Sequence, residues 1–130
     1  MDMDFSELRR RALAVAAPRR LSKSAESGGV GAAILTARGD VYVGACIDMA
    51  CSIGFCAEHA AAAAMVTAGE SVIAKVAAVD ATGRPVPPCG RCREFMAQLS
   101  DRNGDALVLV GEGAAVPLRE LLPLDWRDAF

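Results

Sequence analysis

The chain reads Cys56-Ala57-Glu58 in one segment and Pro88-Cys89-Gly90-Arg91-Cys92 in a second segment further along. Three thiolates hold a zinc ion firmly and leave one coordination position free for water. A carboxylate close to that position moves the protons of the reaction. The pattern therefore predicts a hydrolytic centre with one Zn²⁺ per chain, in which Cys56, Cys89 and Cys92 are the metal ligands and Glu58 is the catalytic acid and base.

Both segments open a predicted helix. Ala57 to Ala68 has high helix propensity and stops at Gly69, and Cys89 to Leu99 forms a second predicted helix after two prolines. Unpaired amides at a helix start lower the pKa of a thiol, so we expect all three ligands to ionise readily. Cys89 and Cys92 are three residues apart and project to the same side of their helix.

Outward from these helices, β-rich runs alternate with helical ones, which predicts an α/β domain with helices on the faces of one sheet. A polar, glycine-bearing stretch, Arg19 to Gly29, is predicted to be a loop. We expect a single domain, 1–130, with an amphipathic first helix over Asp4–Ala17, strands over Val30–Thr36, Val41–Asp48, Val72–Asp80, Leu107–Val110 and Ala114–Val116, and a helical turn over Leu118–Leu122.

Composition narrows the class of partner. The net charge is only −2, and the clusters Arg9–Arg11 and Arg19–Arg20 are not interleaved with aromatic residues, so no polynucleotide partner is indicated. No apolar run reaches the ~18 residues of a membrane span. Five cysteines, an odd number with metal-ligand spacing, favour a reducing cytoplasm, and Cys46 and Cys51 are expected to be small buried residues.

The metal motif resembles the cytidine deaminase family, in which Cys-Ala-Glu is followed by Pro-Cys-x-x-Cys. Val30-Gly31-Ala32-Ala33 and Leu121-Leu122-Pro123 look like further landmarks of that family. Cys89-Gly90-Arg91-Cys92-Arg93 and Leu118–Pro123 look closest to its blasticidin S deaminase branch. The resemblance implies a three-layer α/β/α fold with a mixed five-stranded sheet, and zinc-dependent removal of the exocyclic amine of a cytosine-like ring with release of ammonia.

The resemblance also implies roles around the metal. The backbone amide of Ala57 and the carbonyl of Cys89 would hold the reacting edge of the ring. Arg91 would offset the negative charge of three thiolates. His59, which stands where cytidine deaminases have an arginine that hydrogen-bonds the thiolates, would donate similarly or point elsewhere. An exposed surface position is an equally open interpretation of Arg91.

Substrate recognition departs from the family pattern. Cys46-Ile47-Asp48 stands where nucleoside-binding members carry Asn-x-Glu, and Gly28 stands where an aromatic residue stacks on the pyrimidine. Asp48 is therefore expected either to bind a sugar hydroxyl or to be a polar strand end. Trp126 falls where an aromatic residue reaches into a neighbouring subunit, and packing within its own chain is the alternative.

Three functional classes thus stay open. The first is a deaminase of cytidine, deoxycytidine or a cytosine nucleoside antibiotic such as blasticidin S. A deaminase of a non-nucleoside amino-heterocycle is the second, and a catalytically idle zinc-stabilised interaction module is the third, although Glu58 argues against it. The alanine-rich helix over Ala60–Ala64 and the resemblance predict a homo-oligomer, a tetramer by the family pattern, with a monomer as the alternative.

Overall fold

The structure is a computed structural model that describes residues 3–130. The α-helices are α1 (Phe5–Val15), α2 (Ala57–Thr67) and α3 (Gly90–Gln98). The strands are β1 (Arg19–Ser22), β2 (Ala25–Thr36), β3 (Val41–Met49), β4 (Ile73–Asp80), β5 (Leu107–Gly111) and β6 (Ala114–Pro117). Short 3-10 turns are η1 (Ala50–Ser52), η2 (Asn103–Asp105), η3 (Leu118–Leu121) and η4 (Trp126–Ala129).

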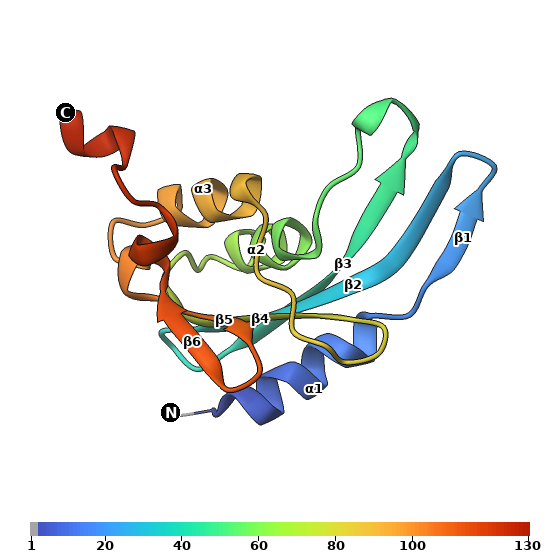
Figure 1. The fold of residues 1–130 in the computed structure, drawn as a ribbon, viewed down its shortest axis with the longest axis horizontal. Coiled ribbons are helices and arrows are strands. Elements are labelled where there is room, and N and C mark those ends of the chain that lie inside the picture. Colours follow the sequence, from blue (N-terminus) through green and yellow to red (C-terminus); the bar gives the residue numbers. More distant parts are fainter. Residues whose placement is uncertain (1–2) are drawn as a thin grey trace.

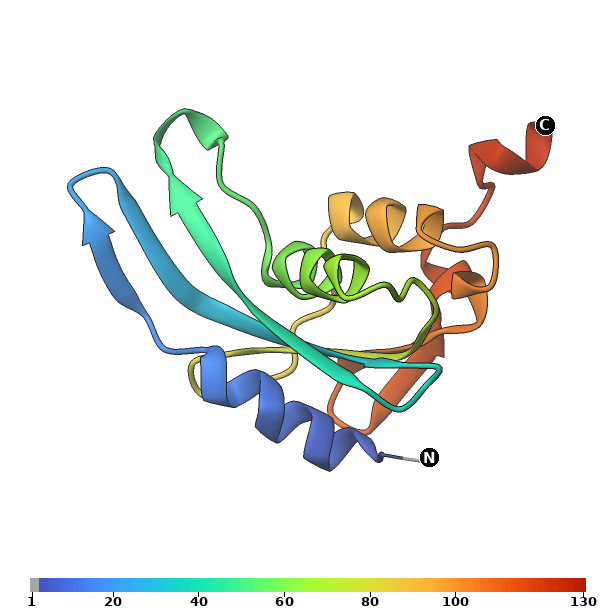
Figure 2. The same ribbon diagram turned by 180° about the vertical axis from the view of Figure 1, so that it is seen from behind.

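The strands form one mixed sheet in three layers with the helices. β2 pairs with β3 on one side and with β4 on the other, and β5 and β6 follow β4. Among the strands of residues 3–130, only β4 and β5 run parallel, and the other pairs are antiparallel. α1 covers one face of the sheet, while α2 and α3 cover the other (Figures 1 and 2). The expected α/β/α class is confirmed, and β1 adds a sixth strand to the five expected.

Alternation along β2 builds a core on each side of the sheet. Ala33 and Leu35 face α1, whereas Ala32 and Ile34 face α2 and α3. All four side chains are buried. Because successive side chains of a strand point to opposite faces, a continuous apolar run is what a strand covered on both sides requires.

The alanines of α2 let the helix lie close to the sheet. A Cβ atom at Gly44 of β3 would lie 2.4 Å from the backbone nitrogen of Ala61. Only glycine facing small helical residues permits such an approach. This close packing fixes the start of α2 against the sheet and thus positions the residues around Cys56.

The prediction of a loop over Arg19–Gly29 is wrong. Arg19–Ser22 pairs with the beginning of β2, which in turn pairs with the end of β3. The three strand ends project beyond the helices as an arm (Figure 1). All four residues of β1 are exposed, so this ribbon lacks the alternation of apolar residues by which a strand is recognised in a sequence.

Cys51 is also not the buried residue expected from its small size, because it is exposed in η1 at the end of the arm and has a φ of 63°. Cys46, in contrast, is buried as expected. None of the helices within residues 3–130 has the length and apolarity that a bilayer crossing requires.

Candidate metal centre

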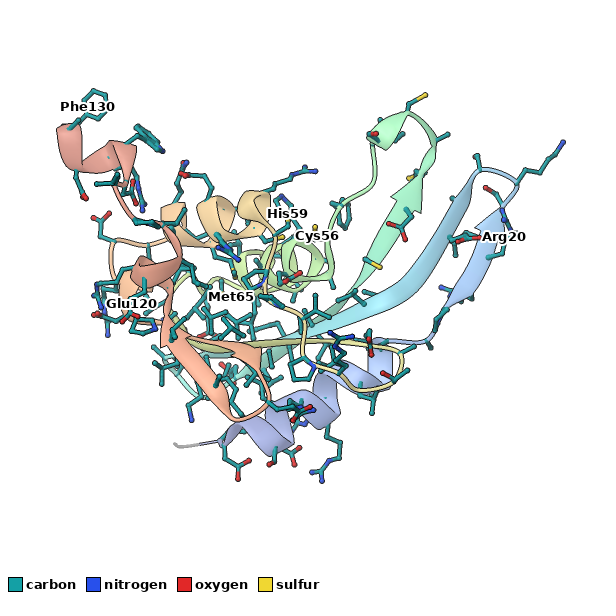
Figure 3. All side chains as sticks on the ribbon, in the orientation of Figure 1. Arg20, Cys56, His59, Met65, Glu120 and Phe130 are labelled. Atoms are coloured by element: carbon teal, nitrogen blue, oxygen red, sulfur yellow. The ribbon has the colours of Figure 1, made fainter. Side chains whose placement is uncertain are left out.

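Three thiols meet where two helices begin. Cys56 is the N-cap of α2 and Cys89 is the N-cap of α3, and neither side chain caps its own helix. Their sulfurs lie 3.1 Å apart, and the Sγ atoms of Cys56, Cys89 and Cys92 all lie within 4.8 Å of one another. Figure 3 shows Cys56 beside His59 at the start of α2.

This donor set fits zinc. Zn–S bonds of about 2.3 Å in a tetrahedron place sulfurs about 3.8 Å apart, within the spread of these three atoms. All five cysteines are free thiols, so the sulfurs are not joined to one another. Within residues 3–130, no further His, Cys, Asp or Glu ligand atom joins the group. Three protein ligands with a fourth position left over are the arrangement of a catalytic zinc site rather than of a structural one.

The pKa values of the thiols show why this cluster needs a cation. Burial, followed by the hydrogen bond with Cys89, raises the pKa of Cys56 to about 11. Burial and the neighbouring Glu58 raise the pKa of Cys92 as well. Burial also acts to raise the pKa of Cys89, but bonds from the Cys56 thiol and the backbone N–H groups of Arg91 and Cys92 bring it below its ordinary value.

The expected ease of ionisation at helix starts thus holds for Cys89 alone in the metal-free chain. Cys56 and Cys92 depart from it first because burial disfavours the charged thiolate, and further because sulfurs held this close together repel one another as thiolates. A divalent cation removes that repulsion, so metal binding and ionisation of the thiols occur together.

Glu58 lies in the first turn of α2 and is 3% exposed. Burial raises the pKa of its carboxyl group. Hydrogen bonds from its own backbone N–H and from the Cys92 thiol lower this pKa and partly offset the rise. Its carboxylate is outside the group of thiol ligand atoms. A carboxyl group with a raised pKa next to a hydrolytic metal position is suited to exchange protons near neutral pH.

A cavity of about 610 Å³ opens onto the metal centre. Its wall comes from β2, β3, the segment before α2, the start of α2 and the loop before α3. The predicted residues Asp48, Cys46, Ala57 and Arg91 all line it, together with Glu58. This volume accommodates a small molecule of nucleoside size.

The part of the cavity wall at the end of β3 carries one thiol and one carboxylate, those of Cys46 and Asp48. The buried thiol of Cys46 accepts a hydrogen bond from the backbone N–H of Val30 at 3.3 Å and lies 4.0 Å from a carboxylate oxygen of Asp48. Asp48 itself is exposed. The structure therefore brings both residues to the cavity, with the carboxylate as the stronger acceptor.

His59 lies behind the metal centre and not in the cavity wall. Its Nδ1 lies 4.0 Å from Cys92 Sγ, and its ring stacks on Phe95 with the centroids 3.7 Å apart. Burial and the positive charge of Arg91 lower the pKa of His59. The guanidinium of Arg91 donates a 3.4 Å hydrogen bond to the carbonyl of Gly54 and borders the same cavity.

Trp126 is the one predicted substrate contact that the chain does not bring to its own cavity. Its indole N–H donates to Glu94 at 3.1 Å, and its ring packs edge-on against Phe130. Figure 3 shows Phe130 far from Cys56. With 55% of its surface exposed, Trp126 does not pack into its own core either.

The cavity also has an aromatic wall that the sequence pattern did not single out. Phe55 directly precedes Cys56, lines the cavity and is 36% exposed. Its position next to a metal ligand was the available signal. An isolated aromatic residue in an irregular segment, however, has no periodicity that marks its direction.

The fold and the three-thiol centre define a zinc-dependent hydrolase. The profile of the cytidine and deoxycytidylate deaminase zinc-binding region matches residues 6–104, which is most of the chain. This protein therefore belongs to the cytidine deaminase family, and Cys56, Cys89 and Cys92 form its zinc-binding triad.

Relatives agree in sequence and in structure. The chain is 40% identical over 98 residues to cytidine deaminase of Halalkalibacterium halodurans, covering 72% of this chain and 74% of the relative. Over 130 residues it is 32% identical to cytidine deaminase of Mycobacterium tuberculosis, covering 99% of this chain and 91% of the relative.

The crystal structure of cytidine deaminase from Mycobacterium tuberculosis superposes with a TM-score of 0.81 at 30% identity, covering 96% of this chain and 98% of that one. The crystal structure of cytidine deaminase from Burkholderia pseudomallei superposes with a TM-score of 0.75 at 29% identity, covering 94% of this chain and 98% of that one.

Proposed function

We propose that this zinc-dependent deaminase hydrolyses the exocyclic amine of the cytosine ring of a nucleoside, cytidine or deoxycytidine, and releases ammonia. The observation that carries the proposal is the buried Glu58 beside three clustered thiols at the floor of an open cavity. The names of its relatives, which are cytidine deaminases, support the choice of substrate.

Glu58 is proposed as the proton carrier of the reaction. When bound, zinc supplies a Lewis acid that makes water a nucleophile at neutral pH. Glu58 takes one proton from the attacking water and passes it to the ring nitrogen. It then takes the second proton, from the hydroxyl now on the ring carbon, and passes it to the amine, which departs as ammonia. The raised pKa of this carboxyl group favours both directions of transfer.

Two backbone groups next to the ligands are proposed to hold the reacting edge of the ring. Ala57 is the first residue of α2, where backbone N–H groups have no partner within the helix. The carbonyl of Cys89 accepts one bond from the Arg93 N–H at 3.0 Å and retains a second lone pair. A donor and an acceptor at these two positions match the edge of a cytosine ring.

Asp48 and Cys46 are proposed to face the sugar. The exposed carboxylate of Asp48 on the cavity wall accepts a hydroxyl hydrogen bond, whereas the Cys46 thiol, already bonded to Val30 N–H, contributes mainly shape. The sugar would therefore be held by one strong hydrogen-bond acceptor, the carboxylate of Asp48.

Arg91 and His59 are proposed to offset the charge of three thiolates on one dication. His59 Nδ1 lies 4.0 Å from Cys92 Sγ, and the Arg91 guanidinium borders the cavity beside the ligands. Residues that hydrogen-bond or face ligating sulfurs tune a metal site in this way.

A cytosine nucleoside antibiotic such as blasticidin S is the second candidate. Arg91 within Cys-Gly-Arg-Cys-Arg favours it, because its exposed guanidinium at the cavity places a positive charge where an anionic substituent would lie. Cys46 and Gly28 leave a non-nucleoside amino-heterocycle as a further alternative.

We propose that the working form is a homo-oligomer, a tetramer by the family pattern. Apolar surface supports it: Trp126 is 55% exposed and Phe130 97%, and Val66 on the outer side of α2 is 46% exposed. Trp126 reaches a substrate only if a neighbouring copy places it there. Size-exclusion chromatography with light scattering measures the assembly.

The five free thiols support a reducing compartment, the cytoplasm.

The test is an ammonia-release screen with zinc-loaded protein on cytidine, deoxycytidine, blasticidin S, cytosine, guanine and aminopyrimidines. Turnover of cytidine or deoxycytidine with the highest kcat/KM is the expected result. Preference for blasticidin S or for a free base would replace the proposed substrate by the corresponding alternative. Absence of ammonia from every compound would favour the idle zinc-stabilised module.

A further inference from the structure

The strand position at Gly28 is closed to a side chain in this protein. Gly28 has a φ of +91°, and a Cβ atom there would lie 2.1 Å from the carbonyl oxygen of Ala17. Any aromatic residue at this position would clash with backbone atoms that join α1 to β1. A planar ring that binds in the cavity must therefore find its stacking surface elsewhere.

Within one chain, the other aromatic side chains are engaged away from that chain's own cavity. Six aromatic residues are present in the sequence, and all lie within residues 3–130. One lies under Lys75, one donates to Glu70, one stacks on His59, and two pack against each other at the carboxy terminus; these are Phe5, Tyr42, Phe95, Trp126 and Phe130. Phe55 is the one aromatic residue that a single chain brings to its own cavity.

The backbone holds Phe55 firmly in that place. Its N–H and C=O both pair with Ile47 of β3, each at 3.0 Å. The next residue is the metal ligand Cys56, so the backbone that carries the ring is anchored beside the metal centre. Its centroid lies 6.1 Å from that of His59, with the planes tilted by 30°. An anchored, partly exposed ring loses little freedom when a ligand stacks on it.

We propose that Phe55 supplies the aromatic face on which the substrate ring stacks, and so determines the preference for a planar heterocycle. This inference rests on the proposed function of the same cavity. Two parts of the cavity wall would then have different roles. The Phe55 ring contacts the base of the substrate, and Asp48 at the end of β3 contacts its polar part.

The test compares the variants Phe55→Leu and Phe55→Tyr with the wild type, all zinc-loaded. Leucine keeps an apolar side chain but has no π face, and tyrosine keeps the face. Phe5→Leu is the matched control, because Phe5 lies on α1 across the sheet from the cavity. Calorimetry measures the Kd of uridine, whose ring is planar, and of tetrahydrouridine, whose ring is saturated. Zinc content and oligomeric state are recorded for each variant.

We expect Phe55→Leu to raise the Kd of uridine and the KM of cytidine by roughly 2- to 10-fold. The Kd of tetrahydrouridine should change by less than that of uridine, and Phe55→Tyr and Phe5→Leu should both match the wild type.

Equal loss for the two ligands, or an unchanged Kd of uridine in Phe55→Leu with zinc intact, would overturn the stacking role. A changed oligomeric state with unchanged ligand binding would also overturn it and assign Phe55 to a contact between copies. If the wild type itself neither binds uridine nor releases ammonia from cytidine, the proposed function fails, and the stacking role fails with it.

Discussion

Replacing Glu58 by glutamine separates proton transfer from every other property of the site. Glutamine keeps the volume of a side chain that is only 3% exposed, and in the metal-free chain its amide oxygen still accepts the hydrogen bond of the Cys92 thiol. Unlike a carboxyl group, the amide cannot take up and release a proton near neutral pH. We expect kcat to fall roughly 10²- to 10⁴-fold, which is the usual contribution of a positioned acid and base. This corresponds to about 3 to 5 kcal/mol of lost transition-state stabilisation.

Zinc content and folding stability should respond differently to Glu58→Gln. The Glu58 carboxylate is not among the clustered ligand atoms, so Glu58→Gln should retain one zinc per chain. Burial raises the pKa of Glu58, so the folded metal-free chain binds this proton more tightly than the unfolded chain. Its stability contribution is therefore present below the ordinary glutamate pKa of about 4.3 and declines as pH rises above it. At pH 7 the metal-free glutamine variant should be at least as stable as the wild type.

Three measurements check this reasoning: ammonia release, zinc by atomic emission, and thermal unfolding of the metal-free chain at pH 4 and 7. Glu120→Gln is the matched control, because Glu120 is an exposed residue of η3 outside the cavity. A Glu58→Gln variant that keeps its activity within tenfold of wild type would remove Glu58 from the reaction. Loss of zinc in that variant would instead show that the carboxylate holds the metal.

Three further outcomes are expected. Cys89→Ser should lose zinc and ammonia release together, because two of three close sulfurs cannot hold an open site; a variant that keeps stoichiometric zinc would contradict the triad. Gly44→Ala should lower the free energy of unfolding by about 1 to 3 kcal/mol, since its Cβ would lie 2.4 Å from the nitrogen of Ala61, whereas Gly111→Ala, with open space around it, should change little in thermal melts. Asp48→Ala should raise the KM of a nucleoside roughly 10-fold or more and leave that of the free base unchanged; equal effects on both would assign the carboxylate to another role.

The sequence alone determined the chemistry of the metal centre. Cys56 and Glu58 lie two residues apart, Cys89 and Cys92 lie three apart, and both pairs fall at helix starts. Such short-range geometry follows from the backbone period of a helix, so it is readable without a structure. A sheet covered by helices was also predictable, because strands buried on both faces leave continuous apolar runs and an amphipathic helix leaves a periodic one.

Tertiary structure decided everything that depends on segments distant in the sequence. It brought Cys89 to within 3.1 Å of Cys56, directed Phe55 to the cavity and left Trp126 outside it. It also paired β1 with β2, although β1 has no apolar face. These relations have no local signature, since they arise from backbone pairing between strands and from the close packing of α2 on the sheet. Such packing depends on residues throughout the chain, whereas the type of a metal ligand is given by the residue at one position of the sequence.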